Sequence, residues 1–292
     1  MDRQTRAYAY ALLAVLFWST VASAFELSLR SLSPVRLLLY SSAASALILG
    51  GVLALQRRFF LFSTYSARDY LRSALLGLLN PFLYYLVLFK AYALLPGQEA
   101  QPLNYTWALA LALLSVPLLR QRIRPASLLA ILISLAGVLV ISTRGRILAL
   151  QFTDPVGVSL ALGSSILWAL FWIFNMRDRR DETAKLFLCC ACGFVFVLGY
   201  ALLTGEARWP DATGLAAGAY VGFFEMGITF VVWLKALGFS RTTAQVSNLV
   251  FLSPFVSLVL LHYVVGEEIY ASSVAGLALI IAGIIIQKRT AG

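Results

Sequence analysis

Charged side chains are scarce in this sequence: Asp, Glu, Lys and Arg make up only 12% of its 292 residues, whereas apolar residues make up 61%. A soluble domain of this size carries charge on about a quarter of its residues. Too few polar side chains remain to cover a surface that faces water, so most of the exterior must face lipid. The scarcity of charge therefore excludes an ordinary soluble domain and indicates an integral membrane protein.

Residues that bind metals or perform catalysis are also few. The sequence has one histidine, His262, and three cysteines, Cys189, Cys190 and Cys192, which lie within one apolar stretch. Their spacing makes a poor zinc site, and we expect buried, inert thiols. The sequence contains no Gly-rich phosphate-binding loop, no HExxH motif and no cluster of Asp and His residues. We therefore predict no catalytic residues, no metal, no cofactor and no enzymatic activity.

The net charge of +10 raises the question of nucleic acid as a partner, but that function needs a clustered basic face. The basic residues here stand in short groups between apolar stretches, as in loops at a membrane surface. The expected partners are therefore the lipid bilayer and a small molecule, with no nucleic acid.

Ten apolar runs along the chain are each long enough for a membrane-spanning helix, which needs roughly 20 residues and satisfies its own backbone hydrogen bonds. The first run follows Arg3 and Arg6 and resembles a signal peptide. No clear small-residue cleavage site follows it, so we expect an uncleaved span and an all-α membrane protein. The predicted spans are 7–26, 34–55, 71–92, 97–119, 125–143, 155–176, 184–204, 212–236, 242–265 and 270–287.

The positive residues in the loops predict the orientation of the spans. With the N-terminus in the cytoplasm, 17 of the 23 Lys and Arg residues fall on the cytoplasmic side and six on the other. Such an excess marks cytoplasmic loops. If one of the ten spans were not a true span, all later loops would change sides, and the excess of Lys and Arg on the cytoplasmic side would disappear. The sequence therefore predicts ten transmembrane helices with both termini in the cytoplasm.

The two halves of the chain carry an internal repeat. At an offset of 145 residues, Gly77 corresponds to Gly222 and Lys90-Ala91 to Lys235-Ala236, and the offset stays near this value into the last span of each half. Repeats of this kind are frequent in transporters and point to their binding sites. Further corresponding pairs are Asn80 with Glu225, Tyr84 with Thr229, Gln101 with Gln245, Asn104 with Asn248 and, at a looser offset of 150, Trp18 with Trp168.

An odd number of spans in each half makes the repeats inverted, because the second half then enters the membrane from the opposite side. We expect one integral membrane unit of two inverted five-helix repeats, residues 1–147 and 148–292. Each half can then gate one side of the membrane, as alternating access by a secondary transporter requires. Without an ATP site, the energy must come from a gradient or from the substrate itself.

The sequence resembles the drug/metabolite transporter superfamily, of the ten-helix EamA type, along its whole length. The resemblance rests on the repeat, the Lys-Ala that ends the third and eighth spans, Pro254, Gly266-Glu267-Glu268 and Ala282-Gly283. The first half departs from the family pattern, since the expected proline falls near Ala110 and the expected Gly-Glu near Arg122-Ile123. Among family members, the sequence is most similar to bacterial exporters of aromatic amino acids.

The resemblance implies an exporter of small metabolites in the bacterial inner (plasma) membrane, with amino acids and an aromatic preference as the first expectation. Other substrates of the family, such as drugs, nucleobases or sugar conjugates, stay open, as do the transport direction and the coupling ion. A membrane-embedded lipid enzyme would need a cluster of polar catalytic groups, and a channel would not need inverted gates. We expect a monomer or a weak dimer.

Glu225 is the one formal charge that we place near the middle of a span, where a charge costs about 2.5–3.5 kcal/mol on insertion scales. Such a residue is usually kept for function, here contact with the substrate or with a coupled proton. The alternative is a neutral packing residue that is hydrogen-bonded to Asn80 across the axis. On a helix, Gly222, Glu225 and Thr229 share one face, which should point into the bundle.

Aromatic and amide side chains complete the candidate site. Trp168 and Trp172 lie one turn apart on the sixth span, where they could stack on a planar ring or hold an ammonium group. Helix packing is the alternative for each tryptophan. Buried amides such as Asn104 and Asn248 either join helices or bind substrate. The predicted substrate-binding residues are Trp18, Asn80, Tyr84, Asn104, Trp107, Trp168, Trp172, Glu225, Thr229 and Asn248.

The predicted topology can be tested with reporter fusions. Alkaline phosphatase fused after Gly292 should be inactive and green fluorescent protein should fluoresce there, because the fusion point lies in the cytoplasm. As a control, phosphatase fused after Gly205, in a loop predicted to face outside, should be active. Phosphatase activity after Gly292 would contradict the ten-span topology.

Overall fold

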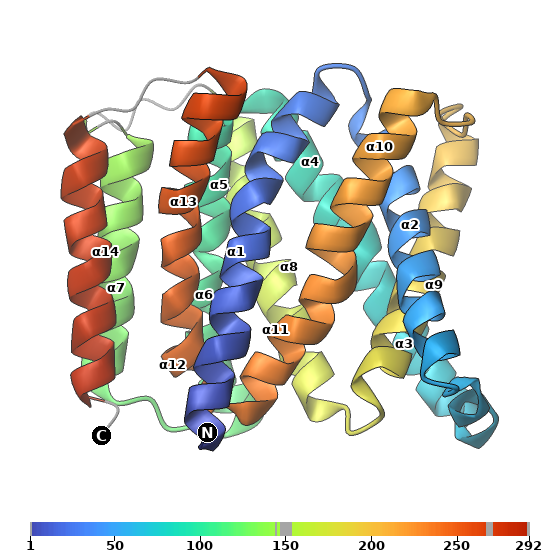
Figure 1. Ribbon diagram of the computed structural model, residues 1–292, viewed down its shortest axis with the longest axis horizontal. Helices are drawn as coiled ribbons and strands as arrows, with labels where there is room; N and C mark the ends of the chain where they lie inside the picture. Colours follow the sequence, from blue (N-terminus) through green and yellow to red (C-terminus); the bar gives the residue numbers. More distant parts are fainter. Residues whose placement is uncertain (1, 144, 147–153, 267–270, 291–292) are drawn as a thin grey trace.

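The computed structural model describes residues 2–143, 145–146, 154–266 and 271–290, and every regular element in these ranges is a helix. The long helices run side by side and are joined by short connections at the two ends of the molecule (Figure 1). The expectation of an all-helical protein is thus confirmed for the described residues. Glu267, Glu268 and the predicted boundary between residues 147 and 148 lie outside them.

The helical elements follow the predicted apolar runs, with short 3₁₀ and π segments labelled η. In the first half they are α1 (Arg3–Leu29), α2 (Pro34–Leu55), η1 (Phe59–Thr64), α3 (Ala67–Gly77), η2 (Leu78–Leu83), α4 (Tyr84–Leu94), α5 (Gly97–Tyr105), α6 (Trp107–Leu119) and α7 (Pro125–Ser142). In the second half they are α8 (Pro155–Arg177), α9 (Glu182–Leu203), α10 (Ala212–Val221), η3 (Gly222–Gly227), α11 (Ile228–Phe239), α12 (Thr243–Ser247), η4 (Asn248–Phe251), α13 (Leu252–Leu260), η5 (Leu261–Val265) and α14 (Ala271–Thr290).

Seven helical segments of the described chain are long and apolar enough to cross a membrane. They are α1, α2, Ala67–Leu94, α8, α9, Ala212–Phe239 and Thr243–Val264. Three shorter apolar helices accompany them, at Leu103–Leu119, Pro125–Val140 and Val274–Ile286. The structure is therefore that of a multi-pass membrane protein.

Side-chain caps set where the helices begin. Asp2 accepts a hydrogen bond from the backbone N–H of Thr5 at 2.6 Å, and Asp154 accepts one from that of Gly157 at 2.7 Å. Such caps satisfy N–H groups that have no partner inside the helix. Because Asp2 precedes α1 and Asp154 precedes α8, the first helix of each half begins in the same way.

The third and eighth predicted spans are broken near their middle. The π segment η2 contains Asn80, whose φ of −155° and ψ of 122° lie outside the helical region, and Pro81, which has no N–H to donate. The π segment η3 contains Glu225, and Gly227 at its end has a φ of −94° and a ψ of −102°. Each of these spans therefore consists of two helical pieces, which the sequence did not predict.

Close contacts at glycines join the two halves of the chain. α3 packs on α9, α10 packs on α2, and α14 packs along α7. A Cβ atom on Gly137 would lie 2.5 Å from the carbonyl oxygen of Gly276, and one on Gly222 would lie 2.6 Å from the Cβ atom of Ala44. Small residues thus let these helices approach more closely than larger side chains would permit.

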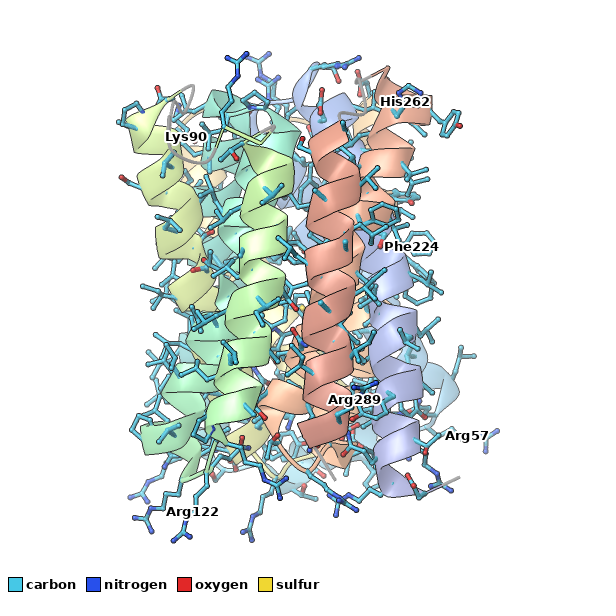
Figure 2. The ribbon with its side chains drawn as sticks, turned by 90° about the vertical axis from the view of Figure 1, so that its left-hand side faces the viewer. Arg57, Lys90, Arg122, Phe224, His262 and Arg289 are labelled. Atoms are coloured by element: carbon cyan, nitrogen blue, oxygen red, sulfur yellow. The ribbon has the colours of Figure 1, made fainter. Side chains whose placement is uncertain are left out.

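Charged residues lie at the two ends of the molecule. Figure 2 shows Arg57, Arg122 and Arg289 at one end, and Lys90 and His262 at the other. α1 begins and α14 ends at the end that carries Arg57, Arg122 and Arg289 (Figure 1), and we call it the terminus end. We call the opposite one the Lys90 end.

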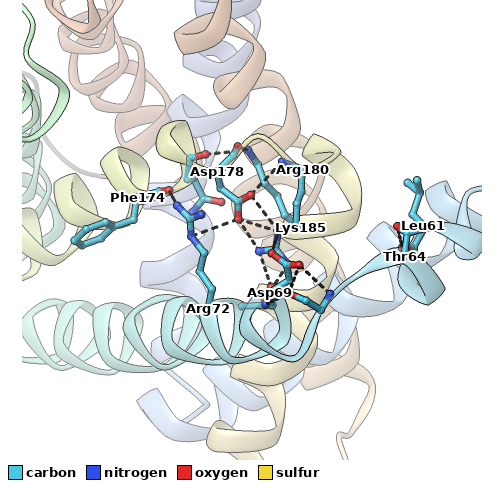
Figure 3. A network of polar contacts seen from close by, with 11 residues as sticks. Leu61, Thr64, Asp69, Arg72, Phe174, Asp178, Arg180 and Lys185 are labelled. Carbon is cyan, nitrogen blue, oxygen red and sulfur yellow. Dashed lines mark hydrogen bonds and ion pairs between the residues drawn. The ribbon is translucent and has the colours of Figure 1, made fainter.

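An ion-pair network at the terminus end joins α3 to α9 and to the loop before it (Figure 3). The buried carboxylate of Asp178 accepts a hydrogen bond from Arg180 Nη2 at 2.6 Å, and Arg72 Nε lies 3.6 Å from it. Arg180 also donates to Ser73 Oγ at 3.0 Å, and Lys185 Nζ donates to the carbonyl oxygen of Asp178 at 2.6 Å. The network therefore fixes the end of α8 against α3.

Burial opposes the ionisation of Asp178, but hydrogen bonds from Arg180 outweigh it and hold the pKa of the carboxyl below its usual value. A lowered pKa means that ionised Asp178 stabilises the folded state above its unfolded-state pKa, which is about 3.9. This stabilisation is lost as the pH falls through the folded-state pKa.

We expect Asp178→Asn to destabilise the protein by about 3 kcal/mol at pH 7, because the largely buried Arg180 loses its nearer charge partner and keeps only Asp69 at 3.9 Å. Thermal unfolding in detergent measures the effect, and the deficit should shrink below about pH 4 as the wild-type carboxyl is protonated. Asp154→Asn is the matched control, since asparagine caps a helix as well as aspartate does. Equal melting temperatures for Asp178→Asn and wild type at pH 7 would contradict the stabilising role of the network.

Candidate functional site

A small internal cavity of about 30 Å³ lies among α1, α4, α5, α6, α8 and η3. It has room for about two water molecules. Its walls combine aromatic rings with a few polar groups, and we call it the central cavity. It is lined by Trp18, Val21, Ala22, Phe25, Tyr84, Leu88, Tyr92, Gln101, Asn104, Tyr105, Trp107, Trp168 and Glu225.

Glu225 supplies the one carboxyl group of this lining. Its side chain is buried and accepts a hydrogen bond from the Tyr85 hydroxyl at 2.8 Å. Within the described residues it has no ion-pair partner. Asn80, the partner considered from the sequence, is fully buried, but its amide group contacts no hydrogen-bond partner in the described part of the chain. The carboxyl is therefore buried with a single neutral hydrogen-bond partner, and a cationic ligand group could supply the charge partner that it lacks among the described residues.

Amide and hydroxyl groups from several helices surround the cavity. Asn104 Oδ1 accepts a hydrogen bond from the Tyr84 hydroxyl at 3.3 Å, and Asn104 Nδ2 donates to Ser164 Oγ at 2.9 Å. The Tyr105 hydroxyl donates to Ser253 Oγ at 2.8 Å. These bonds connect α5 to α4, α8 and α13, so they hold the polar groups of the cavity in fixed positions.

Four tryptophans from four helices meet beside the cavity. The ring centroid of Trp18 lies 5.2 Å from that of Trp233, 5.9 Å from that of Trp168 and 6.2 Å from that of Trp107. The Tyr84 ring lies 4.4 Å from that of Trp168. Aromatic rings at these distances attract one another and offer faces and edges on which a further ring can stack.

Six of the ten residues predicted from the sequence line the central cavity, namely Trp18, Tyr84, Asn104, Trp107, Trp168 and Glu225. The other four, Asn80, Trp172, Thr229 and Asn248, are buried but are not part of its lining. Trp172 packs against Trp168 with a centroid distance of 5.5 Å. The hydroxyl of Thr229 donates to the carbonyl oxygen of Phe224 in its own span.

The sequence analysis missed several residues of the site. Tyr92, Gln101 and Tyr105 line the cavity, and Tyr85 holds Glu225. A signal for Tyr92 was available, because it lies eight residues after Tyr84 and therefore on the same helical face. Gln101 belongs to the same repeat block as Asn104, which also could have identified it.

The arrangement can bind an organic cation that carries an aromatic group. The carboxyl of Glu225 can accept hydrogen bonds from an ammonium group, and the rings of Trp18 and Trp168 can stack on a planar one. Among the described residues, no three His, Cys, Asp or Glu side chains gather as metal ligands would. At about 30 Å³ the cavity is far below the 300 Å³ or so at which ligand pockets begin, so it must enlarge to admit a metabolite.

The family model of the EamA-like transporter family matches residues 5–143 and matches again at residues 155–287. The chain belongs to this family. The two matches cover both halves, so this EamA-like chain carries the family domain twice.

Named relatives of this EamA-like chain are transporters. An uncharacterized transporter of Archaeoglobus fulgidus is 24% identical over 93% of this chain and 93% of its own length. An uncharacterized transporter of Clostridium kluyveri is 25% identical over 58% of this chain, which spans 56% of that relative. The aromatic amino acid exporter YddG of Ancylobacter novellus is 26% identical over 63% of this chain, which spans 64% of that exporter.

The fold of this EamA-like chain is shared by a solved crystal structure. That structure superposes with a TM-score of 0.78 and covers 97% of this chain and 98% of its own. The two sequences are 22% identical, so the likeness shows the fold alone.

Replacing Tyr85 by phenylalanine tests the environment of Glu225. Tyr85→Phe should destabilise the protein by about 1–3 kcal/mol, because the buried carboxyl loses its hydroxyl partner. Thermal unfolding of the purified protein in detergent measures this, with Tyr200→Phe, at a partly exposed ring, as the matched control. The same melting temperature for both variants would mean that the Tyr85 hydroxyl does not support Glu225.

Proposed function

We propose that this chain is a secondary transporter that exports small metabolites, namely amino acids with an aromatic preference, by alternating access. The observation that carries the proposal is the central cavity, where the Glu225 carboxyl lies beside tryptophan and tyrosine rings without a protein cation among the described residues. A carboxylate suits the ammonium group of an amino acid, and the rings suit an aromatic side chain. The name of the Ancylobacter novellus relative supports the same substrate class.

We also propose ten transmembrane spans in two inverted five-helix repeats, residues 1–147 and 148–292. The double match of the family model supports this division. So does the burial of α1 and α8, since residues 4–28 and 154–178 have the same order of buried, half-buried and exposed side chains. The packing of α3 on α9 also has its counterpart in the packing of α10 on α2.

For the location we propose the bacterial inner membrane, with both termini in the cytoplasm and a monomer or weak dimer as the working unit. The excess of basic residues in alternate loops supports this orientation. Arg57, Arg122 and Arg289, all predicted to be cytoplasmic, lie at the terminus end, and Lys90 lies at the opposite one (Figure 2). The terminus end would then face the cytoplasm.

Transport requires the cavity to open toward each side in turn. On its terminus-end side, Phe171, Trp172, Phe230 and Trp233 pack with no exposed surface. The rings of Phe171, Trp172 and Phe230 contact one another, with centroids 5.2 Å apart for Phe171 and Trp172 and for Trp172 and Phe230, whereas the Trp233 ring packs on Trp18. In this conformation the cytoplasmic side is therefore closed by a layer of aromatic rings.

Counterflow in proteoliposomes tests the proposed activity. Vesicles that contain the purified protein and are loaded with unlabelled phenylalanine, tyrosine or tryptophan should accumulate the labelled amino acid transiently, and the initial rate should saturate with concentration. Lysine and glutamate serve as controls, because neither has an aromatic ring. Counterflow only with nucleobases or sugar conjugates would overturn the substrate class, and non-saturable flux without counterflow would indicate a channel.

Glu225→Gln tests the role proposed for the carboxyl. Glutamine keeps the shape of the side chain but cannot titrate or pair with an ammonium group, so transport should lose its pH dependence or the KM for the amino acid should rise markedly. Glu182→Gln, in the first turn of α9, is the matched control and should transport like wild type. A well-expressed Glu225→Gln protein with the rate, KM and pH profile of wild type would assign Glu225 to packing alone.

A further inference from the structure

The repeat gives each residue of the central cavity a counterpart in the other half of the chain, and the inference here rests on the inverted repeat proposed above. On α1 and α8 the offset is 150, so Ala22 corresponds to Trp172 and Phe25 to Asn175. On the broken third and eighth spans the offset is 145, so Glu225 corresponds to Asn80 and Leu88 to Trp233. On the fourth and ninth spans it is 144, which pairs Gln101 with Gln245 and Asn104 with Asn248.

Six of these counterparts share an unusual property: each is at least nine-tenths buried and carries polar atoms without a hydrogen-bond partner in the part of the chain that the structure describes. We call them the mirror set, and they are Asn80, Trp172, Asn175, Trp233, Gln245 and Asn248. Folded proteins pair the large majority of their buried polar side-chain atoms. Six unpaired groups at related positions therefore need a common reason.

Among the counterparts in the central cavity, the amide groups of Gln101 and Asn104 are paired, although the indole N–H groups of Trp18 and Trp168 in the same lining have no partner among the described residues. Asn104 bonds to Tyr84 and to Ser164, whereas neither polar atom of Asn248 has a partner among the described residues. Gln101 Nε2 donates to Ser257 Oγ at 2.9 Å, whereas Gln245 Oε1 accepts no hydrogen bond from the described residues. The two amide pairs thus have related positions in the repeat but opposite states of hydrogen bonding, and Glu225, which is bonded to Tyr85, differs from Asn80 in the same way.

Four members of the mirror set lie on the terminus-end side of the molecule, and Asn80 lies at the break in the middle of its span. Trp233 and Gln245 belong to α11 and α12, which lie toward the terminus end in Figure 1. Trp172 and Asn175 belong to the last part of α8, which ends at the network of Asp178. This is the side that the aromatic rings close in the present conformation.

We propose that the mirror set is a second half-site, which lines the cavity when it opens toward the terminus end and binds the polar part of the same substrate. In an inverted repeat, each half can adopt the conformation that the other half has in this structure. The cavity then opens on the opposite side and is lined by the corresponding residues of the other half. Opening on this side brings water or substrate to the six side chains, and their polar atoms then gain the partners that they lack in the closed state.

The chemistry of the mirror set differs from that of the central cavity. Its members are amides and indoles, without formal charge, and they offer N–H donors from Asn80, Trp172, Trp233 and Asn248 together with amide oxygens. Such groups suit a small zwitterion, whose carboxylate accepts N–H bonds and whose ammonium group donates to amide oxygens. Glu225 has no charged counterpart, so the ammonium is held by a carboxylate only in the cavity described above.

Accessibility of single cysteines tests the half-site without reference to any substrate. Asn248→Cys and Gln245→Cys are made in a protein whose three native cysteines are replaced by alanine, with Asn104→Cys as the matched repeat position and the buried Ala108→Cys as control. A membrane-impermeant maleimide should label both mirror positions several times faster in inside-out vesicles than in right-side-out vesicles. Asn104→Cys should show the opposite preference, and Ala108→Cys should stay unlabelled.

The outcomes separate this inference from the proposed function. Labelling of Asn104→Cys together with no labelling of Asn248→Cys and Gln245→Cys from either side would overturn the half-site alone. Labelling of the mirror positions from the Lys90 end would also overturn it. If neither Asn104→Cys nor the mirror positions are labelled, the cavity does not open and the proposed transport fails with the half-site.

Melting temperatures give a second measurement that does not depend on labelling. Asn248→Leu should leave the melting temperature unchanged or raise it, because it removes buried polar atoms that have no partner within the described residues. Asn104→Leu should lower it, because Tyr84 and Ser164 lose their partner. An equal loss for both variants would show that Asn248 is paired in the folded protein and would contradict the half-site.

Discussion

The hydrocarbon interior of a membrane offers no water, so each polar atom that the chain carries there costs free energy unless it finds a partner within the chain. The helices meet this demand for the backbone, and serine hydroxyls meet it locally, as Ser19 does by donating to the carbonyl oxygen of Val15. A carboxyl group cannot be satisfied in this way. Glu225 is held instead by Tyr85, which lies 140 residues away in the sequence, and this distant bond ties the polar centre of one half to the other.

The same constraint explains where the helices break. A break releases backbone groups from the helical ladder, and inside a membrane these can be tolerated only where protein surrounds them. Both breaks, at Asn80 and at Gly227 just after Glu225, lie at buried positions. Glycine makes this possible for η2, since a Cβ atom on Gly193 of α9 would lie 2.6 Å from Cγ of Pro81. The breaks therefore belong to the interior and carry the two polar residues of the third and eighth spans with them.

Much of the fold was predictable because apolar length is a property of the sequence alone, and the predicted span 34–55 has the same limits as α2. The breaks were not predicted, although Pro81 was a signal, because hydropathy is averaged over a whole span and one proline changes it little. The site was predictable only in part. Tyr84 and Tyr85 are neighbours in sequence, yet one bonds to an amide of α5 and the other to Glu225. Helix rotation and packing against distant segments decide which side chain reaches which partner, and no local pattern contains this information.

The inverted repeat that we propose makes the two halves alike in sequence, but a single conformation cannot give both halves the same environment. Asn104 is bonded through both its amide oxygen and its amide nitrogen, whereas Asn248 at the same repeat position has no partner in the described residues. The C-terminal ends of α1 and α8, the first helix of each half, differ as well. Asp178 after α8 is bound by Arg180, while Ser28, at the same position 150 residues earlier, is uncharged and donates to a carbonyl oxygen of its own helix. The terminus end is thus held by charge-assisted hydrogen bonds that have no equivalent at Ser28. In the alternating access that we propose, the two opened conformations are therefore expected to differ in free energy.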